Sequence, residues 1–520
     1  MTTSSSQTAV RQSIAIRGEG LSIADVVAVA RDFAPVALDP GCHEAILRSQ
    51  AFIAQIVTEG RVVYGVTTGF GALKDRRIPV RSTEDLQLNL IRSHAAGVGP
   101  ALAQDVVRAM LLLRANALAK GASGVRLETI ERLVAMLNLG LHPVIPSQGS
   151  VGASGDLAPL AHMALTLLGE GEIERLGEVI PAGQALAEAG LAPLRLGAKE
   201  GLALINGTQA MTAIACLTLD GAEKLAKIAD VACATTLDAV LGSSRAYLPH
   251  FHAMRPHPGQ QASARNLTRL AAESEIFASH IDCDRVQDCY SLRCAPQVHG
   301  ASRDALGHVR RVLEIEINSA TDNPLIFPDR GEVLTGGHFH GQPIALASDF
   351  LKIAVAELAN ISERRIERLV NPAYSSGLPA FLAPDGGLNS GYMLAQYTAA
   401  ALVSENKVLA HPASVDSIPT GGGQEDHVSM GTHGARQAAE ILANAQQVLA
   451  LELLCGAQGL EFRLPLRPGV GGSAARQAVR SVVAPLDGDR QSSVDFAACV
   501  AAVRDGSLLA AVEREVGALE

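Results

Sequence analysis

One stretch of the chain sets its organisation: Gly149-Ser150-Val151-Gly152-Ala153-Ser154-Gly155-Asp156-Leu157-Ala158-Pro159-Leu160. It joins glycines and small residues to one acid and one proline, and an apolar helical pattern comes after it. Glycine lets a backbone bend tightly because it carries no Cβ atom. We therefore expect a sharply folded loop that leads into a helix.

The tripeptide Ala153-Ser154-Gly155 can become an electrophile without external help. Attack of the Gly155 nitrogen on the Ala153 carbonyl closes a five-membered ring. Loss of water from that ring and from the Ser154 side chain leaves 4-methylidene-imidazol-5-one, an electron-poor alkene built from the chain itself. The alternative is a plain turn or helix end, which is the usual meaning of Gly-Ala-Ser-Gly in a chain with 49 glycines.

The tetrapeptide occurs twice, so the flanking residues must distinguish the copies. The first copy, at residues 121–124, continues as Val125-Arg126-Leu127-Glu128 and resembles an ordinary connection between helices. The second copy, at residues 152–155, has glycine close by on its N-terminal side and Asp156-Leu157-Ala158-Pro159-Leu160-Ala161-His162 after it. We expect the second copy to be the electrophile.

Composition bounds the class of protein. A chain of 520 residues, 48% hydrophobic and 18% charged, can bury a large core in two or more domains or in one very extended helical domain. Its net charge of -10 argues against a nucleic-acid partner, since phosphate binding needs clustered Lys and Arg. The most apolar uncharged run, residues 201–219, contains Asn206-Gly207-Thr208-Gln209 and fits a buried helix better than a membrane span.

The eight cysteines are scattered and form no CxxC pair, so we expect no metal site and reduced thiols in a cytoplasmic protein. The polar N-terminus, Met1-Thr2-Thr3-Ser4-Ser5-Ser6-Gln7, lacks a charged segment followed by an apolar one, and we expect a loose tail, not a signal peptide.

Apolar spacing near three and four predicts an all-α fold. We expect helices over residues 23–33 and 43–55, a helical region over 84–137, and long bundle helices from 201 to about 462. One β-hairpin is expected at 169–182, with Gly177 at its turn. The predicted organisation is an N-terminal, mostly helical domain (1–205) that carries the electrophile loop, and then an extended helical-bundle domain (206–520).

Polar segments interrupt these helices, and such segments are where sites are built. They are the Gly-rich loop Tyr64-Gly65-Val66-Thr67-Thr68-Gly69-Phe70-Gly71; Ile205-Asn206-Gly207-Thr208-Gln209; Gln287-Asp288-Cys289-Tyr290-Ser291-Leu292-Arg293-Cys294; Ser319-Ala320-Thr321-Asp322-Asn323-Pro324; Gly337-His338-Phe339-His340-Gly341; and Gln424-Glu425-Asp426-His427-Val428-Ser429-Met430.

Together with residues 149–162, these segments resemble the aromatic amino acid ammonia-lyases: the histidine, phenylalanine and tyrosine lyases and their aminomutase relatives. The resemblance runs from about residue 64 to residue 462. It implies a carbon–nitrogen lyase that removes ammonia and one β-hydrogen from an α-amino acid. It also implies a 4-methylidene-imidazol-5-one formed from Ala153-Ser154-Gly155, no external cofactor or metal, and a homotetramer whose active sites draw residues from several subunits.

The resemblance further implies roles for individual side chains. A tyrosine near the β-carbon can act as the base if neighbours lower its pKa, and a guanidinium can bind both oxygens of the substrate carboxylate. The implied residues are Tyr64 as the leading candidate base, Asn206 and Tyr290 near the electrophile, Arg293 on the substrate carboxylate, and Gln287 and Phe339 along the pocket.

Two places bear on the substrate. His94 sits where family members differ in substrate choice, and the segment around Glu425 resembles the histidine-lyase version, where phenylalanine and tyrosine lyases typically have Asn-Gln-Asp-Val. A carboxylate suits an imidazole, which carries N–H donors, whereas phenylalanine offers nothing to pair with it. We therefore expect conversion of L-histidine to trans-urocanate.

Three departures keep the alternatives open. Histidine lyases commonly have Asn where this chain has Thr67, His338 and Gly423. Phenylalanine or tyrosine lyase and aminomutase activities, with the same electrophile, are the alternatives. A fumarase-like lyase lacks support because Gly242-Ser243-Ser244-Arg245 does not continue as that family's Gly-Ser-Ser-x-Met-Pro loop. A non-catalytic helical scaffold would not lose two waters from its mass.

Overall fold

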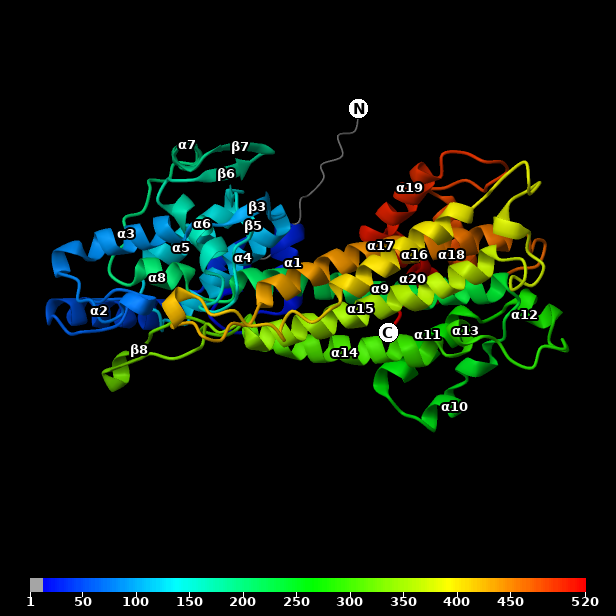
Figure 1. The fold of residues 1–520 in the computed structure, drawn as a ribbon, viewed down its shortest axis with the longest axis horizontal. Coiled ribbons are helices and arrows are strands. Elements are labelled where there is room, and N and C mark those ends of the chain that lie inside the picture. The colour runs from blue at the N-terminus through cyan, green and yellow to red at the C-terminus, as the bar shows by residue number, and fades with distance from the viewer. Residues whose placement is uncertain (1–12) are drawn as a thin grey trace, which may run out of the picture. The chain divides into compact units, whose positions relative to one another are not determined.

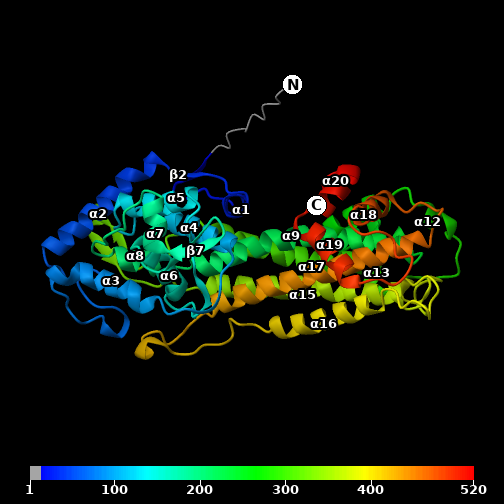
Figure 2. The ribbon, with the colours of Figure 1, turned by 90° about the horizontal axis from the view of Figure 1, so that it is seen from above.

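The computed structural model describes residues 13–520, and helices dominate it, as predicted (Figures 1 and 2). Within this described range the chain forms two compact units. The first unit contains the chain up to Leu217 together with Arg311–Ser348 and Pro412–Arg436, and the second contains Thr218–Arg310, Asp349–His411 and Gln437–Glu520. The predicted division cuts the chain once, after residue 205. In the structure the polypeptide passes between the two units several times, because long helices begin in one unit and end in the other.

The first unit holds eight helices of its own among its described residues. They are α1 (Ile23–Arg31), α2 (His43–Thr58), α3 (Thr83–His94), α4 (Gln104–Ala119), α5 (Leu127–Asn138), α6 (Leu157–Leu167), α7 (Ala182–Glu188) and α8 (Glu200–Ile205). The helix predicted over 23–33 is α1, and the helix predicted over 43–55 is α2. Ser22 begins α1 with a capping box, since its hydroxyl accepts a hydrogen bond from the Asp25 amide.

Four helices run through the unit boundaries, and eight further helices belong to the second unit. The four are α9 (Gln209–Ala239), α14 (Ala295–Glu316), α15 (Gln342–Val370) and α17 (Gly431–Glu461). The eight are α10 (Pro249–Ala253), α11 (Pro258–Leu270), α12 (Glu275–Ser279), α13 (Tyr290–Arg293), α16 (Met393–Leu409), α18 (Val470–Arg480), α19 (Ser492–Arg504) and α20 (Ser507–Val516).

The strands are short and, within residues 13–520, all lie in the first unit. Parallel β1 (Ile14–Ile16) and β2 (Val36–Leu38) form one pair, and antiparallel β3 (Val98–Ala101) and β5 (Pro146–Gln148) form another. The predicted hairpin is β6 (Glu172–Arg175) and β7 (Glu178–Pro181), which β4 (His142–Pro143) extends to three strands. Gly177 occupies its turn with φ of 84°. A second hairpin, β8 (Leu325–Phe327) and β9 (Glu332–Leu334), was not predicted from the sequence.

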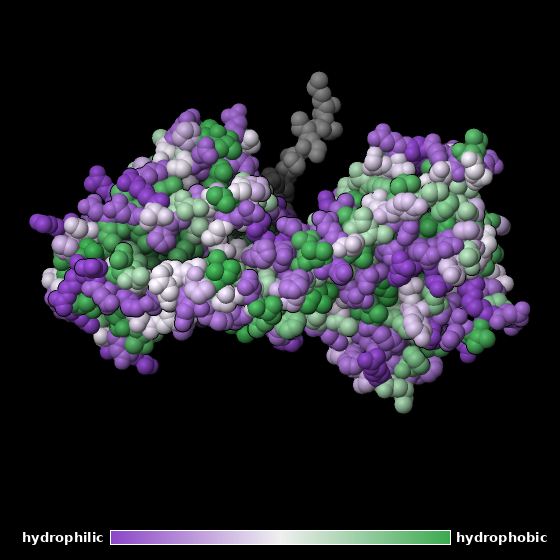
Figure 3. All heavy atoms as spheres, in the orientation of Figure 1, coloured by the Kyte–Doolittle hydropathy of each residue, from purple (hydrophilic) through white to green (hydrophobic). Residues whose placement is uncertain are grey.

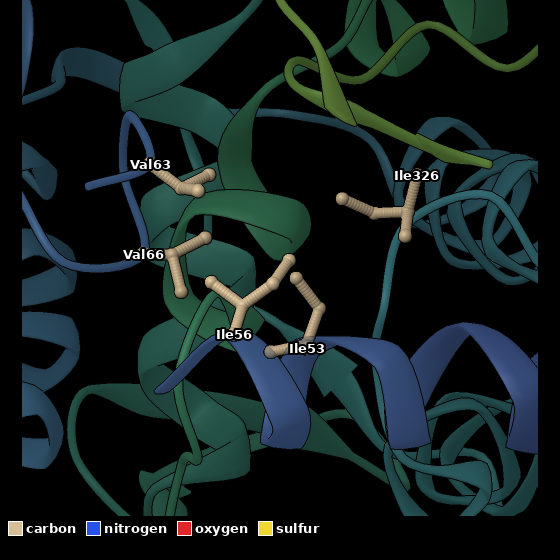
Figure 4. Packing of buried hydrophobic residues seen from close by; sticks show 5 residues of the cluster. All are labelled: Ile53, Ile56, Val63, Val66 and Ile326. Atoms are coloured by element: carbon tan, nitrogen blue, oxygen red, sulfur yellow. The ribbon is translucent and has the colours of Figure 1, made fainter. Parts of the chain in front are cut away.

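A small apolar cluster fixes the segment that precedes the Gly-rich loop. Ile53 and Ile56 of α2 pack with Val63, Val66 and Ile326 of β8 (Figure 4). The three isoleucines are 4% exposed or less. Because burial of each such side chain contributes about 1.5–3 kcal/mol, the cluster holds the start of the Gly-rich loop against the second hairpin.

Helix α17 is the one helix of residues 13–520 that is long and apolar enough to cross a membrane. Its most apolar window is 67% buried within the protein. The helix is therefore a core helix of the bundle.

Hydrophilic residues are spread over the visible face (Figure 3), with apolar residues scattered among them.

Candidate active site

The loop at residues 149–156 folds back on itself through its glycines. Gly149, Gly152 and Gly155 have φ of 128°, 67° and 72°, and residues that carry a side chain rarely adopt these backbone angles. A Cβ atom at Gly155 would also overlap the carbonyl oxygen of Gly207, with which Gly155 forms a β-bridge. Both observations require glycine at this position, so the expected sharp loop is confirmed.

Asp156 anchors the end of this loop where α6 begins. The carboxylate is fully buried and accepts hydrogen bonds from the hydroxyls of Ser150 and Thr432 and from the Met211 amide at 2.8 Å. The Asp156 amide donates to the Gly207 carbonyl at 2.7 Å. Burial raises the pKa of Asp156, and these hydrogen bonds oppose that effect. The contacts join the loop to the first residues of α9 and α17.

Asn206 reaches the tripeptide directly. Its Nδ2 donates to the Ser154 carbonyl oxygen at 2.8 Å. Asn206 ends α8 in an extended conformation, so its own carbonyl turns away from the helix and accepts from Arg114 Nη1 at 3.0 Å. Arg114 Nη1 also donates to Gln209 Oε1 at 2.8 Å. The predicted proximity of Asn206 and Ser154 is thus present within the first unit.

Arg114 contacts the same site, although it was not among the residues expected there from the sequence. It is fully buried in α4, and burial lowers the pKa of its guanidinium to about 10. A single arginine that ends the apolar run Met110-Leu111-Leu112-Leu113 was the available signal. A charge at such a position is costly unless it contacts something specific, and here it fixes Asn206.

Two of the polar segments close over the other side of the loop. Ser429 Oγ donates to the Gly152 carbonyl at 2.9 Å, and the Met430 amide donates to the Val151 carbonyl at 2.9 Å. The Gly341 amide donates to the same Gly152 carbonyl at 3.3 Å. The segments 337–341 and 424–430 therefore contact the loop, as expected for parts of one site.

Tyr64 lies in the Gly-rich loop close to Glu425. The Tyr64 hydroxyl accepts a hydrogen bond from the Gly71 amide at 3.3 Å, and a Cβ atom at Gly71 would lie 3.6 Å from Glu425 Oε1. Burial raises the pKa of Tyr64, the hydrogen bond from the Gly71 amide lowers it, and the Glu425 carboxylate raises it. The net effect is a raised pKa, whereas a base requires a lowered one.

Glu425 itself is half-buried and has an unusual environment. Its Oε2 is buried and has no hydrogen-bond partner among the described residues. A buried acceptor without a partner costs about 1–3 kcal/mol. An N–H donor brought by a substrate would remove that cost.

His94 ends α3, and its Nδ1 lies 2.9 Å from the Leu90 carbonyl oxygen. Because a carbonyl only accepts, Nδ1 carries the proton and Nε2 is an acceptor. Burial lowers the pKa of His94, so the ring is neutral at neutral pH. Just beyond it, Gly97 packs against Gly149, since a Cβ atom at Gly149 would lie 3.2 Å from Gly97 Cα. The end of α3 is therefore next to the electrophile loop.

For Phe339 and Thr67 the structure shows the local surroundings but no direct contact with the tripeptide. Phe339 is half-buried on the segment 337–341, and next to it His340 stacks on His427 with ring centroids 5.5 Å apart. Of the departures, Thr67 has a clear local role, since its hydroxyl donates to the Arg61 carbonyl at 2.6 Å and accepts from the Val63 amide. Thr67 therefore closes the turn that carries Tyr64.

Gln287, Tyr290 and Arg293 belong to the second unit. Gln287 is exposed, and the Tyr290 side chain is 70% exposed. The Arg293 guanidinium lies over the Tyr290 ring at 4.5 Å, and its Nε donates to the Asp288 carbonyl at 2.9 Å. Their roles at the electrophile stay predictions.

No group of three or more His, Cys, Asp or Glu side chains within residues 13–520 could hold a metal ion. The chemistry available to the described site is that of the loop, a tyrosine, an amide and a carboxylate.

Comparisons with known proteins show which family and which sequences this chain resembles. The family model for aromatic amino acid lyases matches residues 21–481. Histidine ammonia-lyase of Gloeobacter violaceus is 61% identical over 507 residues, covering 98% of this chain and 99% of that protein. Histidine ammonia-lyase of Symbiobacterium thermophilum is 57% identical and covers 97% of this chain and 99% of that protein.

Solved structures of two related proteins have a similar fold. The histidine ammonia-lyase structure from Trypanosoma cruzi has a TM-score of 0.90 at 44% identity, covering 97% of this chain and 96% of that one. Tyrosine aminomutase from Streptomyces globisporus has a TM-score of 0.93 at 40% identity, covering 98% and 100%.

Proposed function

The chain belongs to the aromatic amino acid lyase family and is a carbon–nitrogen lyase, and we propose that it eliminates ammonia from L-histidine to give trans-urocanate. The C–N bond and one β-C–H bond of histidine break, a carbon–carbon double bond forms, and ammonia leaves with the proton as ammonium. The observation that carries the choice of substrate is the buried Oε2 of Glu425, which lies beside Tyr64 and has no hydrogen-bond partner within residues 13–520. The 51–61% identical histidine ammonia-lyases among its relatives support the same choice.

The loop fits the formation of 4-methylidene-imidazol-5-one from Ala153-Ser154-Gly155. Gly152 and Gly155, on either side of Ala153-Ser154, have the left-handed backbone of a tight loop, and Asn206 holds the Ser154 carbonyl. Once formed, this group supplies an electron-poor alkene to which the substrate amine can bond, which makes the amine a better leaving group. Asn206 Nδ2 draws electron density towards the Ser154 oxygen, and Arg114 keeps Asn206 in place.

Tyr64 is the base in this proposal. A positioned base contributes typically ~10²–10⁴-fold, so it must be near the β-carbon and must lose its own proton first. The carboxylate of Glu425 disfavours that loss. Positive charge brought by the substrate ammonium group opposes this effect, so Tyr64 becomes a better base when the site is occupied.

Glu425 and His94 select the substrate. Glu425 Oε2 accepts the imidazole N–H of histidine, for which the free chain offers no substitute among its described residues. Neutral His94 presents an acceptor nitrogen at the end of α3. Phenylalanine has no N–H on its ring, so its binding would leave Glu425 unpaired in the pocket.

We further propose that the active enzyme is a homotetramer in which Gln287, Tyr290 and Arg293 serve the electrophile loop of another copy. Arg293 then binds the substrate carboxylate. Support comes from exposed apolar side chains in the second unit, on α16 and on the part of α15 that belongs to this unit, which a partner would cover. On α15 and α16 these are Phe350, Ile353, Leu394 and Tyr397, which are 47–58% exposed.

Complementation tests this assembly. Ser154→Ala and Arg293→Met are each expected to be inactive alone. Co-expressed, they should recover activity, because some sites then combine an intact tripeptide from one copy with an intact Arg293 from another. No recovery in mixed tetramers, verified by two different affinity tags, would contradict sites shared between subunits.

A cytoplasmic location completes the proposal. All eight cysteines are free thiols, which fits a reducing compartment.

A product assay tests the function itself. Purified protein is incubated separately with L-histidine, L-phenylalanine and L-tyrosine, and products are separated by liquid chromatography. We expect trans-urocanate and ammonium in equal amounts from histidine, with far slower release of cinnamate or coumarate. Preference for phenylalanine or tyrosine, or β-amino acids as the main product, would contradict the proposal.

A further inference from the structure

A cavity of about 490 Å³ lies in the first unit, lined by none of the residues assigned above to catalysis or substrate binding. Its lining residues come from α4, the C-terminal end of α5 and the turn of the β6–β7 hairpin, among others. Its size is within the range of about 300–1,000 Å³ that is typical of small-molecule sites. Five of its lining side chains give the cavity its chemical character: Phe33, Arg108, Leu139, His142 and Leu176.

Arg108 places a buried positive charge at this cavity. Its side chain is only 2% exposed, and its guanidinium lies 4.0 Å from the centre of the Phe33 ring. Nε donates to the Val29 carbonyl at 2.9 Å, and Nη1 donates to the Leu137 carbonyl and to His142 Nε2. All of these partners are neutral, and Nη2 has no hydrogen-bond partner among residues 13–520. The guanidinium therefore has two free N–H groups and no counterion in the described chain.

His142 does not supply the missing charge. Its Nε2 accepts from Arg108, so its proton is on Nδ1. Burial and the neighbouring Arg108 charge lower the pKa of His142 to about 4, and the ring is neutral at neutral pH. Nδ1 is buried and lacks a partner in the described structure. The described residues that line the cavity thus carry one net positive charge.

We infer that this cavity binds a small organic carboxylate, with its anionic group on the free edge of the Arg108 guanidinium and its apolar body against Phe33, Leu139 and Leu176. A buried charge is costly unless it is paired, and a guanidinium binds a carboxylate through two parallel N–H groups. The wall contains large apolar side chains that remain solvent-exposed: Phe33 is 52%, Leu139 46% and Leu176 94% exposed. Their exposure favours a ligand with an apolar ring or chain over a bare inorganic anion.

The test measures binding of benzoate to the wild-type enzyme by isothermal titration calorimetry, at an ionic strength held constant with sodium chloride. Acetate and inorganic phosphate are titrated in parallel. We expect saturable binding of benzoate that is tighter than that of acetate, which lacks the apolar body, and tighter than that of phosphate.

Two substitutions locate the binding site. Leu176→Glu adds a negative charge at the cavity mouth on a side chain that is almost fully exposed, so folding should be unaffected. It should weaken benzoate binding by about fivefold, since exposed charges interact modestly. Leu388→Glu makes the same change on an 86% exposed leucine of the second unit and should leave benzoate affinity unchanged. Arg108→Gln should abolish binding at this cavity.

Equal benzoate affinity in Leu176→Glu, Leu388→Glu and the wild type would overturn the inference, because benzoate would then bind only at the active site or not at all. Phosphate binding that responds to Leu176→Glu, without any benzoate response, would contradict the apolar body of the ligand.

Discussion

The chain contains the same tetrapeptide, Gly-Ala-Ser-Gly, in two loops whose glycines have similar φ angles and whose surroundings differ. Gly121 and Gly124 of the first loop have φ of 70° and 72°, and Gly152 and Gly155 of the second have φ of 67° and 72°. The φ angles of their glycines therefore do not distinguish the two loops.

Their neighbours do distinguish them. The first loop packs on apolar side chains: a Cβ atom at Gly124 would overlap Ile53, and the Ala122 carbonyl accepts from the Ile326 amide at 2.8 Å. Both isoleucines belong to the cluster in Figure 4. The Ser123 hydroxyl is buried there without a partner in the described structure.

The second loop is surrounded by hydrogen-bonding groups. Asn206 donates to the Ser154 carbonyl, Ser429 donates to the Gly152 carbonyl, and Asp156 fixes the end of the loop. The comparison indicates that the tetrapeptide by itself determines only a tight turn. Hydrogen-bond donors from distant segments then make one of the two turns suitable for electrophile formation.

The largest expected effect comes from changing the serine of each loop. Ser154→Ala should prevent formation of the electrophile and lower kcat for histidine by about 10³-fold or more. Enzymes accelerate reactions by ~10⁶-fold or more, and the base that remains in the variant typically contributes only ~10²–10⁴-fold. Ser123→Ala, the matched change, should retain full activity. It should also keep or slightly raise Tm, since it removes a buried hydroxyl without a partner in the described chain. Steady-state assays and thermal denaturation check both, and equal activity loss in the two variants would break the comparison.

A second variant removes the donor that marks the second loop. Asn206→Ala should lower kcat by about 10²-fold, the typical loss for one preorganised donor to a reacting oxygen. Asn318→Ala removes a structural amide that bonds the Leu21 backbone and serves as the control. We expect its kcat to be unchanged. A normal kcat in Asn206→Ala would mean that the contact with Ser154 is structural only.

Substrate choice sharpens the comparison further. Glu425→Gln keeps the size of the side chain and removes its charge, and kcat/KM for histidine should fall about tenfold or more, since hydrogen bonds to charged groups contribute ~1.5–3 kcal/mol. The neighbouring exposed carboxylate is the control, and Asp426→Asn should change kcat/KM little. If the two variants behave alike, Glu425 does not contact the imidazole.

A smaller effect is expected at the end of α3. His94→Leu removes the acceptor nitrogen and gives the pocket an apolar wall, so kcat/KM for histidine should fall severalfold while turnover of phenylalanine becomes measurable. Competition assays with both substrates check this ratio. An unchanged ratio would show that His94 only packs against the Leu90 turn.

The smallest effect concerns pH. The Glu425 carboxylate raises the pKa of Tyr64, and the proposed base works after it has lost its proton. Activity therefore rises with pH through that pKa. In Glu425→Gln the rising limb of the kcat/KM profile should move to lower pH, because removal of the carboxylate charge lowers the pKa of Tyr64. Movement to higher pH would contradict the role of Tyr64.

Several parts of the fold can be predicted from the sequence because they are local. Glycine spacing predicts the loop at 149–156, apolar periodicity predicts α1 and α2, and the position of Gly177 predicts the β6–β7 hairpin. Each depends on neighbours only a few residues apart along the chain.

Other parts depend on segments that are distant in sequence. Arg114 was missed because its meaning comes from Asn206, ninety-two positions away, and not from its own helix. The β8–β9 hairpin was missed because three-residue strands carry too little alternation to be recognised. A tyrosine can act as the base if its neighbours lower its pKa, and only the folded structure reveals that burial and the Glu425 carboxylate raise the pKa of Tyr64.

The central claim is that the second Gly-Ala-Ser-Gly loop, and not the first, becomes the electrophile. Intact mass spectrometry of the purified wild-type protein, combined with peptide mapping, tests it most directly. We predict a mass lower than that of the sequence by two waters, with the whole loss in the peptide that contains residues 152–155 and an unmodified peptide for residues 121–124. A full-length mass without this loss, or a loss located in the first loop, would contradict the claim.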